Sequence, residues 1–325
     1  MPGSLAGLAQ RIPASFFAIV MGLGGLGTAW RAAARTYPAL APAGDVLIVA
    51  ATAVWILLAA AYAAKWSRAA TAARSEWEHP VAGAFVALLP ASLLLLLPAL
   101  APWLGSAATR GLFVLLAVTQ FTLAAAIVAR WIGVQSESAA VTPVWHLGVV
   151  AGHLFTAGAA AALGYRLTGW CFFGAGVIMW VIIDSIVLHR LATHEPLAPP
   201  LRPLIAIELA PPSVALIMYL ALGEGEADAL ALGLFGYALF VACVLLMLAR
   251  RLCETPFGPG YWAFTLPAAA LSTAAWSIAH ASASDTAAYV ALALFVAANA
   301  VIGFIAARTI AALARGSFLP GQRGA

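Results

Sequence analysis

The sequence contains little charge. Only 9% of its 325 residues are Asp, Glu, Lys or Arg, whereas 64% are hydrophobic, and the mean hydropathy is +0.99. A soluble globular domain carries about 25% charged residues, so this composition excludes a soluble globular protein. Long polar segments are absent as well, because the longest, 65–79, is hardly more than a linker. The sequence therefore predicts an all-α integral membrane protein with a single membrane domain over 1–325.

Cysteine is also scarce. Cys171, Cys243 and Cys253 form no paired framework, which excludes a disulfide-stabilised scaffold, and we expect all three thiols to be reduced. The basic residues do not cluster with aromatic residues, so the net charge of +4 does not indicate a nucleic-acid partner.

Long apolar stretches are abundant. A bilayer core of about 30 Å needs roughly 20 apolar residues in a helix, and ten stretches of about that length are present. They are separated by short connections and flanked by tails at 1–11 and 309–325. The ten expected spans are 12–31, 45–64, 80–100, 110–130, 143–164, 169–188, 203–222, 229–249, 259–281 and 286–308.

Five prolines introduce the odd-numbered stretches at similar intervals of 67, 63, 60 and 56 residues. Proline is tolerated at the first position of a helix, where its missing N–H has no partner in any case. The regular spacing predicts an internal repeat of two helices and a turn, present five times. We therefore expect five helical hairpins in a quasi-five-fold arrangement about a pore. The five prolines are Pro13, Pro80, Pro143, Pro203 and Pro259.

Interior glycine and proline residues are concentrated in the odd-numbered stretches. Because lipid cannot satisfy a carbonyl group that proline frees, such breaks favour positions surrounded by protein or by a water-lined cavity. We therefore expect the odd helices to form an inner ring that lines the pore, and the even helices to face lipid. The alternative is that these small residues only help helices to pack. The predicted pore kinks are Gly22, Gly24, Pro90, Gly152, Pro211, Pro212 and Pro267.

Basic residues predict the orientation. With ten spans, 12 Lys and Arg residues fall in the tails and the even-numbered links, and 4 fall on the other side. Short cytoplasmic loops carry the basic excess, so both termini are expected in the cytoplasm. All five odd helices would then point their positive N-terminal ends at the cytoplasmic entrance and attract anions there. The inner helices carry no ring of charged side chains, which is typical of weak binding and conduction.

Five short motifs follow one another along nearly the whole chain, from about 12 to 308. They are Ser15-Phe16-Phe17-Ala18-Ile19-Val20-Met21-Gly22, His79-Pro80, Leu188-His189-Arg190-Leu191, Ala210-Pro211-Pro212 and Tyr261-Trp262-Ala263-Phe264-Thr265-Leu266-Pro267. Together they resemble the tellurite-resistance/dicarboxylate transporter family, which includes bacterial TehA proteins and plant slow anion channels. The resemblance implies a homotrimer in the bacterial inner membrane, with one pore per subunit that conducts small anions. Candidate pore-lining residues are Ser15, Phe16, Phe17, Phe85, Phe155, Ser213 and Thr265.

The resemblance also implies a gate on the ninth helix. The family closes its pore with a phenylalanine immediately before the proline, and this sequence has Leu266 at that position. Phe264 is the second candidate, although it points about 200° away from Leu266 on an ideal helix. The alternative is that both side chains simply pack between helices.

Few ionisable residues lie within the stretches, and such residues are costly to bury in a membrane. Glu208 lies near the start of the seventh stretch, close enough to the cytoplasmic face to reach Arg202 or water, so we expect a structural ion pair or a hydrogen-bonded cap. Asp184 lies near the end of the sixth stretch, where we expect it to meet Arg190 or His189.

Two histidines of the fifth stretch, His146 and His153, are seven residues apart and thus on one helix face. Together with Glu208 they are candidate pH-sensitive residues, and packing histidines are the alternative. His189 and His194 lack the helical spacing of a metal pair, so we expect neither a metal nor a cofactor.

Three functions are compatible with a membrane protein of this kind. A passive anion channel is favoured by the apolar inner helices. A proton-coupled or facilitated transporter of dicarboxylate, sulfite or tellurite, with Glu208 and His153 as proton carriers, is the alternative. An enzyme is not expected, because no nucleophile, base or metal cluster lies at membrane depth in the sequence.

Overall fold

The computed structural model describes residues 12–134, 137–223 and 225–318, and within these ranges every regular element is a helix. Eight helices are long and apolar enough to cross a membrane, and η5 with α7 adds a shorter apolar helix at Leu147–Ala162. The chain is therefore a multi-pass helical membrane protein. Two short 3-10 turns, η2 (Pro38–Leu40) and η4 (Ser138–Ala140), lie in connections.

Each segment expected as an odd-numbered span begins with a 3-10 or π segment and then continues as an α-helix. The five pairs are η1 (Ala14–Phe16) with α2 (Phe17–Ala34), η3 (Ala82–Ala87) with α5 (Leu88–Leu104), the π segment η5 (Leu147–Ala151) with α7 (Gly152–Ala162), η6 (Pro199–Leu209) with α9 (Ala210–Leu222), and η7 (Pro259–Phe264) with α11 (Thr265–Ser282). The segments with α7 and α11 are nevertheless not among the eight helices long and apolar enough to cross a membrane. The repeated prolines Pro13 and Pro259 directly open η1 and η7.

The even-numbered spans are continuous α-helices. They are α3 (Ala41–Arg68), α6 (Ser106–Gly133), α8 (Arg166–Thr193), α10 (Ala229–Leu252) and α12 (Asp285–Ala314). Asp228 caps α10, since its Oδ1 accepts from the Ala231 N–H at 2.9 Å, and the Tyr219 hydroxyl lowers the pKa of this carboxyl. The polar segment expected to be only a linker contains a further helix, α4 (Ala70–Glu78).

The predicted proline kinks lie at the junctions rather than in the middle of α-helices. Pro90, Pro211, Pro212 and Pro267 all fall among the first three residues of an α segment. Hydrogen bonding changes there from i−3 to i−4 acceptors, so a missing N–H costs less than inside a continuous α-helix. Among the described residues, the prolines in the interior of an α-helix are instead Pro98 and Pro102 of α5, and Pro203 lies inside the 3-10 helix η6.

Burial separates the two sets of helices. Residues are 61% buried in the best windows of spans 14–34, 82–104 and 199–222, but only 17–33% buried in α3, α6, α8, α10 and α12. Among the odd-numbered helices, α2 contacts α5 and α11, α7 contacts α5 and α9, and α9 contacts α11. Each also contacts the even-numbered helix that follows it in sequence.

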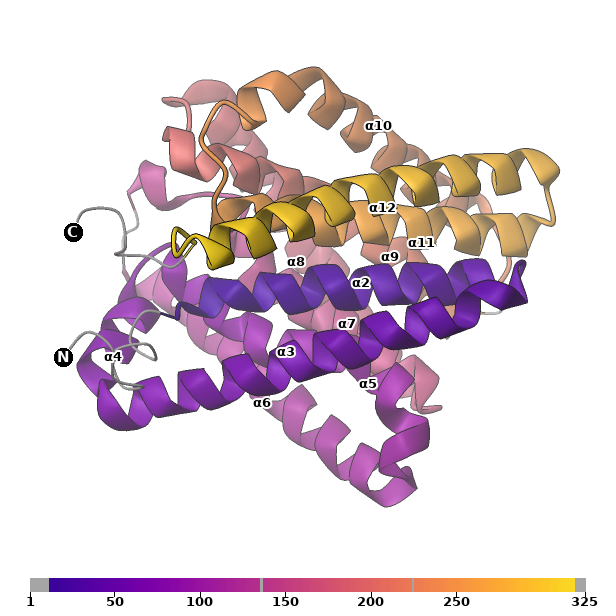
Figure 1. Ribbon diagram of the computed structural model, residues 1–325, viewed down its shortest axis with the longest axis horizontal. Helices are drawn as coiled ribbons and strands as arrows, with labels where there is room; N and C mark the ends of the chain where they lie inside the picture. The colour runs from indigo at the N-terminus through magenta and orange to yellow at the C-terminus, as the bar shows by residue number, and fades with distance from the viewer. Residues whose placement is uncertain (1–11, 135–136, 224, 319–325) are drawn as a thin grey trace.

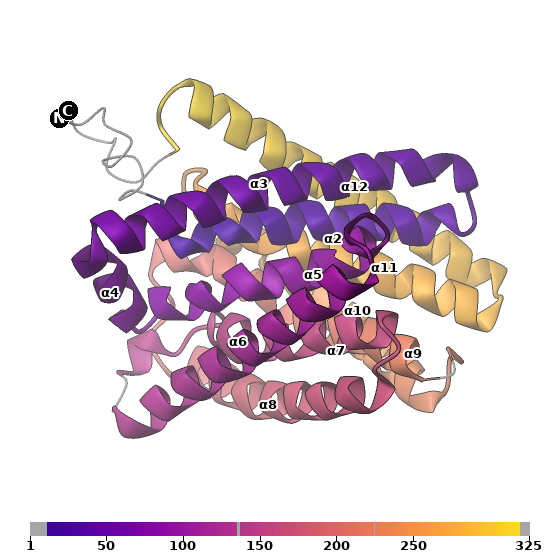
Figure 2. The ribbon, with the colours of Figure 1, turned by 90° about the horizontal axis from the view of Figure 1, so that it is seen from below.

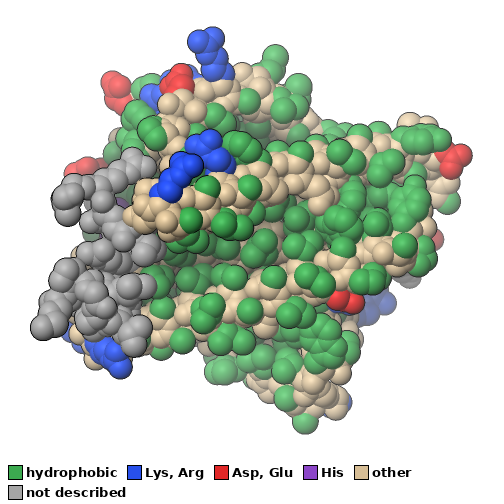
Figure 3. Space-filling view, viewed as in Figure 1, with side chains coloured by type: hydrophobic (Ala, Val, Ile, Leu, Met, Phe, Trp, Pro, Cys, Tyr) green, Lys and Arg blue, Asp and Glu red, His purple; other side chains and the backbone are tan. Residues whose placement is uncertain are grey.

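The views in Figures 1 and 2 show this arrangement, with α2 and α3 running side by side in opposite directions. The start of α2 and the end of α12 lie at the same end of the molecule, at the left of Figure 1. We call this end the proximal face and the opposite end the distal face. Hydrophobic side chains dominate the surface in Figure 3, and most of the Lys and Arg side chains visible there lie toward the proximal face.

The predicted glycines mark close approaches between helices. A Cβ atom on Gly22 would lie 2.2 Å from Thr265 Oγ1, and one on Gly24 would lie 2.8 Å from Leu96 Cδ2. A Cβ atom on Gly152 would lie 1.8 Å from Gln120 Nε2. α2 continues without a break through Gly22 and Gly24, so packing is the role that the structure gives these two residues.

We expect Gly22→Ala to destabilise the protein by about 1–3 kcal/mol, because the β-branched Thr265 side chain must move to admit the methyl group. Gly303→Ala in α12 is the matched control, since its Cβ atom would have no neighbour within 4 Å. The midpoint of thermal unfolding in detergent measures both. Equal midpoints for the two variants would show that the α2–α11 contact is not tight.

Candidate functional site

Three cavities follow one another along the odd-numbered helices. The proximal cavity has a volume of about 480 Å³ and is lined by the starts of these spans, including Ser15, Phe85, Pro200 and Pro259. The distal cavity, of about 340 Å³, is lined by residues near their other ends, such as Thr28. Together they indicate an interrupted path through the molecule.

A middle cavity of about 20 Å³ separates the two larger ones. Leu147, Ile207 and Leu266 line both the proximal and the middle cavity, whereas Phe155 lines both the middle and the distal cavity. A volume of this size holds about one water molecule. Apart from His146, every residue that lines the middle cavity is apolar, so the interruption is formed mainly by apolar side chains.

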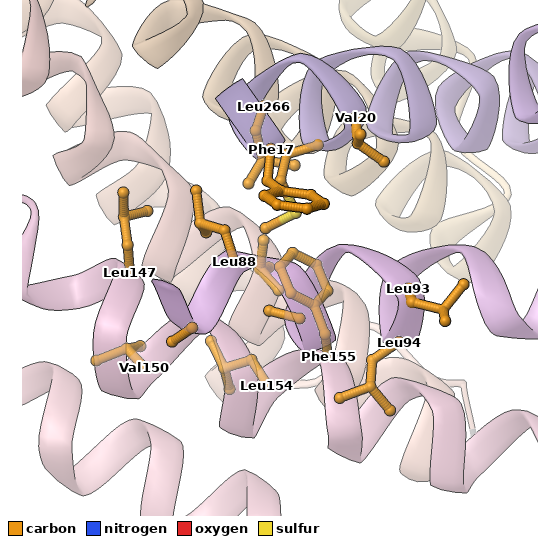
Figure 4. Packing of buried hydrophobic residues seen from close by; sticks show 14 of the residues in the cluster. Phe17, Val20, Leu88, Leu93, Leu94, Leu147, Val150, Leu154, Phe155 and Leu266 are labelled. Atoms are coloured by element: carbon orange, nitrogen blue, oxygen red, sulfur yellow. The ribbon is translucent and has the colours of Figure 1, made fainter. Parts of the chain in front are cut away.

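The residues of the interruption come from different helices. Figure 4 shows Leu88 of α5, Phe155 of α7 and Leu266 of α11, which each line at least one of the three cavities, turned toward the same central region. Leu266 is 7% exposed and lies one residue before Pro267, at the junction of η7 and α11. The change from 3-10 to α geometry at this junction sets the direction of the Leu266 side chain.

The other gate candidate lies elsewhere. The ring of Phe264 packs at 6.0 Å from the ring of Tyr261, and in the described part of the chain it lines none of the three cavities. Phe264 ends the 3-10 helix η7, whereas Leu266 belongs to α11, so the two side chains have different surroundings.

Three of the predicted pore-lining residues line the cavities, namely Ser15, Phe85 and Phe155. The remaining four are described residues that line none of the three and have other partners. Phe16 packs against Phe318, Phe17 packs edge-on against Tyr62, Ser213 Oγ donates to the Leu209 carbonyl, and Thr265 Oγ1 donates to the Trp262 carbonyl.

An ion pair at the proximal cavity could not be anticipated from the sequence. Lys65 Nζ lies 2.6 Å from Glu76 Oε2, with the two side chains only 6% and 10% exposed. Glu76 Oε1 also accepts from the Ala14 N–H at 2.7 Å, which ties α4 to the start of η1. Glu76 and His79 line the cavity, so the entrance carries a neutralised pair in addition to the helix N-termini.

Both predicted ion pairs of the intramembrane carboxylates are wrong. Arg202 pairs with Glu254 instead of Glu208. Arg190 donates through Nε to the Ser138 carbonyl at 3.2 Å, and Asp184 accepts from the Tyr237 hydroxyl at 3.1 Å.

The two histidines of the fifth span have different surroundings. His146 lines the middle cavity and lies 3.9 Å from both Asp184 Oδ1 and Glu208 Oε1, through its two ring nitrogens. His153 packs between the rings of Phe121 and Phe172, on the side of α6 and α8. Only His146 is therefore placed beside the path.

These features define a class: a multi-pass helical membrane protein with an interrupted internal path and no catalytic constellation on it among the described residues. The model of the voltage-dependent anion channel (SLAC1) family matches residues 11–310, so the chain belongs to this family. The chain is also 32% identical over 317 residues to the tellurite resistance protein TehA homolog of Haemophilus influenzae, covering 94% of this chain and 92% of that protein. The family consists of anion channels and transporters rather than enzymes.

We expect Glu76→Gln to destabilise the protein by about 3–5 kcal/mol, because it leaves the Lys65 ammonium buried without a negative partner. Asp45→Asn is the control, since the Arg31–Asp45 pair is 39% and 49% exposed and is expected to contribute at most about 1 kcal/mol. Thermal unfolding in detergent at neutral pH compares the two. A loss for Glu76→Gln no larger than for Asp45→Asn would contradict this reading.

Proposed function

We propose that the protein is a channel for passive conduction of small anions, with α2, α5, α7, α9 and α11 as a ring around the pore. The observation that carries the proposal is the alignment of three cavities along these helices, interrupted only by a short apolar segment. The contacts of α2 with α5 and α11, and of α7 and α9 with their neighbours, support a closed ring of five. The five following helices would surround this ring in five hairpins and face lipid.

Several features favour anions over cations. All five odd-numbered spans start toward the proximal face, so their N-terminal partial charges are positive there. The basic excess of the predicted cytoplasmic side adds to this potential over about 8–10 Å. Arg31 also lines the distal cavity, where its guanidinium group is paired with Asp45 at 3.0 Å. The proximal face would be cytoplasmic, with both termini there, in the bacterial inner membrane.

The gate in this proposal is Leu266, with Phe155 as a second barrier one step further along the path. Leu266 separates the proximal from the middle cavity and Phe155 separates the middle from the distal cavity. An anion loses its hydration at such a constriction and finds only His146 as a polar side chain there, so the closed state would hold ions back until Leu266 and Phe155 move.

A homotrimer with one pore per subunit stays a prediction from the family resemblance. The particular anion is also open, because members of one family differ in substrate. Chloride, nitrate, sulfite, malate and tellurite are the anions to compare.

A proton-coupled carrier is the second candidate, and one observation favours it: His146 lies beside the middle cavity and within 3.9 Å of both Asp184 and Glu208. His153, the proton carrier expected with Glu208, packs among aromatic rings instead. A carrier of this kind would therefore use His146.

We expect Leu266→Ala to raise anion conductance several-fold in planar bilayers, because it removes three carbon atoms from the constriction. Leu271→Ala is the matched control: it lies on the same helix and is equally buried, but packs against Leu209, Ala238 and Val241. We expect it to leave conductance unchanged. Unchanged current in Leu266→Ala, or an equal rise in both variants, would remove Leu266 from the gate.

A second measurement separates channel from carrier. In proteoliposomes containing Leu266→Ala, we expect the reversal potential to follow the anion gradient for chloride or nitrate and to ignore an imposed pH gradient, because passive conduction couples to no other ion. Sulfite and malate gradients then rank the permeant anions. A reversal potential or flux that follows the proton gradient would contradict the channel and favour the carrier.

A further inference from the structure

Three ionisable residues that are 24 to 62 positions apart in sequence have their side chains close together between the helices. His146 directly precedes η5, Asp184 belongs to α8 and Glu208 belongs to η6. One ligand atom from each lies within 4.8 Å of those of the other two. We propose that these three side chains bind one divalent transition-metal ion of the Zn²⁺ or Mn²⁺ type.

The surroundings of His146 leave one ring nitrogen available as a ligand. Nδ1 lies 3.2 Å from the Pro143 carbonyl, to which it donates in the neutral ring. Nε2 then carries the lone pair, and it is buried without a hydrogen-bond partner in a side chain only 2% exposed. A carbonyl that fixes one nitrogen as N–H and leaves the other free is the usual support for a metal-binding histidine.

The distances suit a shared cation better than a hydrogen bond. Nε2 lies 3.9 Å from Asp184 Oδ1, which is too long for a hydrogen bond. Zinc bonds to nitrogen and oxygen measure about 2.0–2.2 Å, so two ligands of a tetrahedral ion lie about 3.4 Å apart. The three ligand atoms lie within 4.8 Å of one another, so both carboxylates have to move inward to bind one ion, and Glu208 Oε1, which lies 3.9 Å from Nδ1, has to move toward Nε2. The Tyr237 hydroxyl, which donates to Asp184 Oδ2, holds the second oxygen of that carboxylate.

Charge balance favours an ion at this position. Among the described residues, neither Asp184 nor Glu208 has a Lys or Arg nitrogen within 4.0 Å, because Arg202 and Arg190 have other partners. Glu208 Oε1 is buried without any hydrogen-bond partner. Two carboxylates at membrane depth are costly unless they are compensated. A divalent cation with a neutral imidazole neutralises both.

The cluster is accessible from the side. A lateral cavity of about 570 Å³ is lined by Asp184, Glu208 and Tyr237, and extends to Arg251 near the end of α10. It is separate from the three cavities of the path, since His146 alone of the three residues lines the middle cavity. A metal ion can therefore reach the carboxylates without passing the constriction.

Binding would connect outer and inner helices. Leu147 and Ile207, which follow His146 and precede Glu208 in sequence, line the middle cavity. The metal would join these two positions to α8, and thereby hold the constriction in one arrangement. The site itself stands on the side-chain geometry and does not depend on the proposed channel activity.

The test uses the full chain, purified in detergent without a polyhistidine tag and stripped with EDTA. Zn²⁺ or Mn²⁺ alone is then added, and bound metal is counted by inductively coupled plasma mass spectrometry alongside thermal unfolding. We expect one ion per chain and an unfolding midpoint that rises with metal concentration. Glu208→Gln and Asp184→Asn should each weaken binding by at least about 10–100-fold, the loss that even supporting residues of metal sites cause.

Two controls separate this site from others. The double variant His189→Ala/His194→Ala removes a pair of rings 6.0 Å apart near the end of α8 and should leave binding unchanged. His153→Gln removes a second buried histidine of the same span and should also leave it unchanged. Because the assay measures bound metal, it is independent of conductance and of the gate.

Three outcomes would overturn the proposal. They are absence of metal uptake by the wild-type protein, uptake that persists in Glu208→Gln and Asp184→Asn, and uptake abolished by the His189/His194 variant. If the wild-type protein takes up no metal, a proton shared between the Asp184 and Glu208 carboxylates would be the remaining way to reduce their charge.

Discussion

The cost of an unpaired backbone N–H or C=O group in hydrocarbon governs this structure. Each such group costs several kcal/mol, so a segment that faces lipid must satisfy its own hydrogen bonds. The even-numbered helices do so as continuous α-helices. Apart from the short turns η2 and η4, the 3-10 and π segments of the described residues open the odd-numbered spans, and three of those spans, 14–34, 82–104 and 199–222, are 61% buried against 17–33% for the even-numbered helices. Irregular backbone is thus placed where protein surrounds it.

This placement also produces the constriction. Where η7 changes to α11, Leu266 turns toward the path, and the contact between Gly22 and Thr265 brings α2 close to α11 at that level. Small residues at such contacts let backbones approach closely, which narrows the space between the helices. Leu266 and Phe155 lie at the two ends of the remaining middle cavity of about 20 Å³, which each of them shares with a larger cavity. Close packing and closure of the path therefore have one cause.

Features that depend on local composition could be predicted from the sequence. Hydropathy indicated the helices, and the glycine and proline content separated the buried from the exposed set. The pairing of Glu208 with Arg202 failed for a physical reason: η6 is a 3-10 helix, in which six residues rise about 12 Å instead of about 9 Å. The meeting of His146 with Asp184, and of Lys65 with Glu76, depends on how helices cross, which no local pattern records.

The carboxylates beside the path impose a condition on anion conduction. A unit negative charge about 8 Å from a permeating anion costs about 2 kcal/mol at an effective dielectric constant of about 20. Asp184 and Glu208 would together impose a barrier of that order or larger, because His146, which both approach, lines the middle cavity. Neutralising them by a divalent cation or by protons removes this barrier. If the proposed pore conducts anions past His146, the two carboxylates behind that histidine therefore have to be neutralised by added positive charge, and the supply of that charge would control conduction.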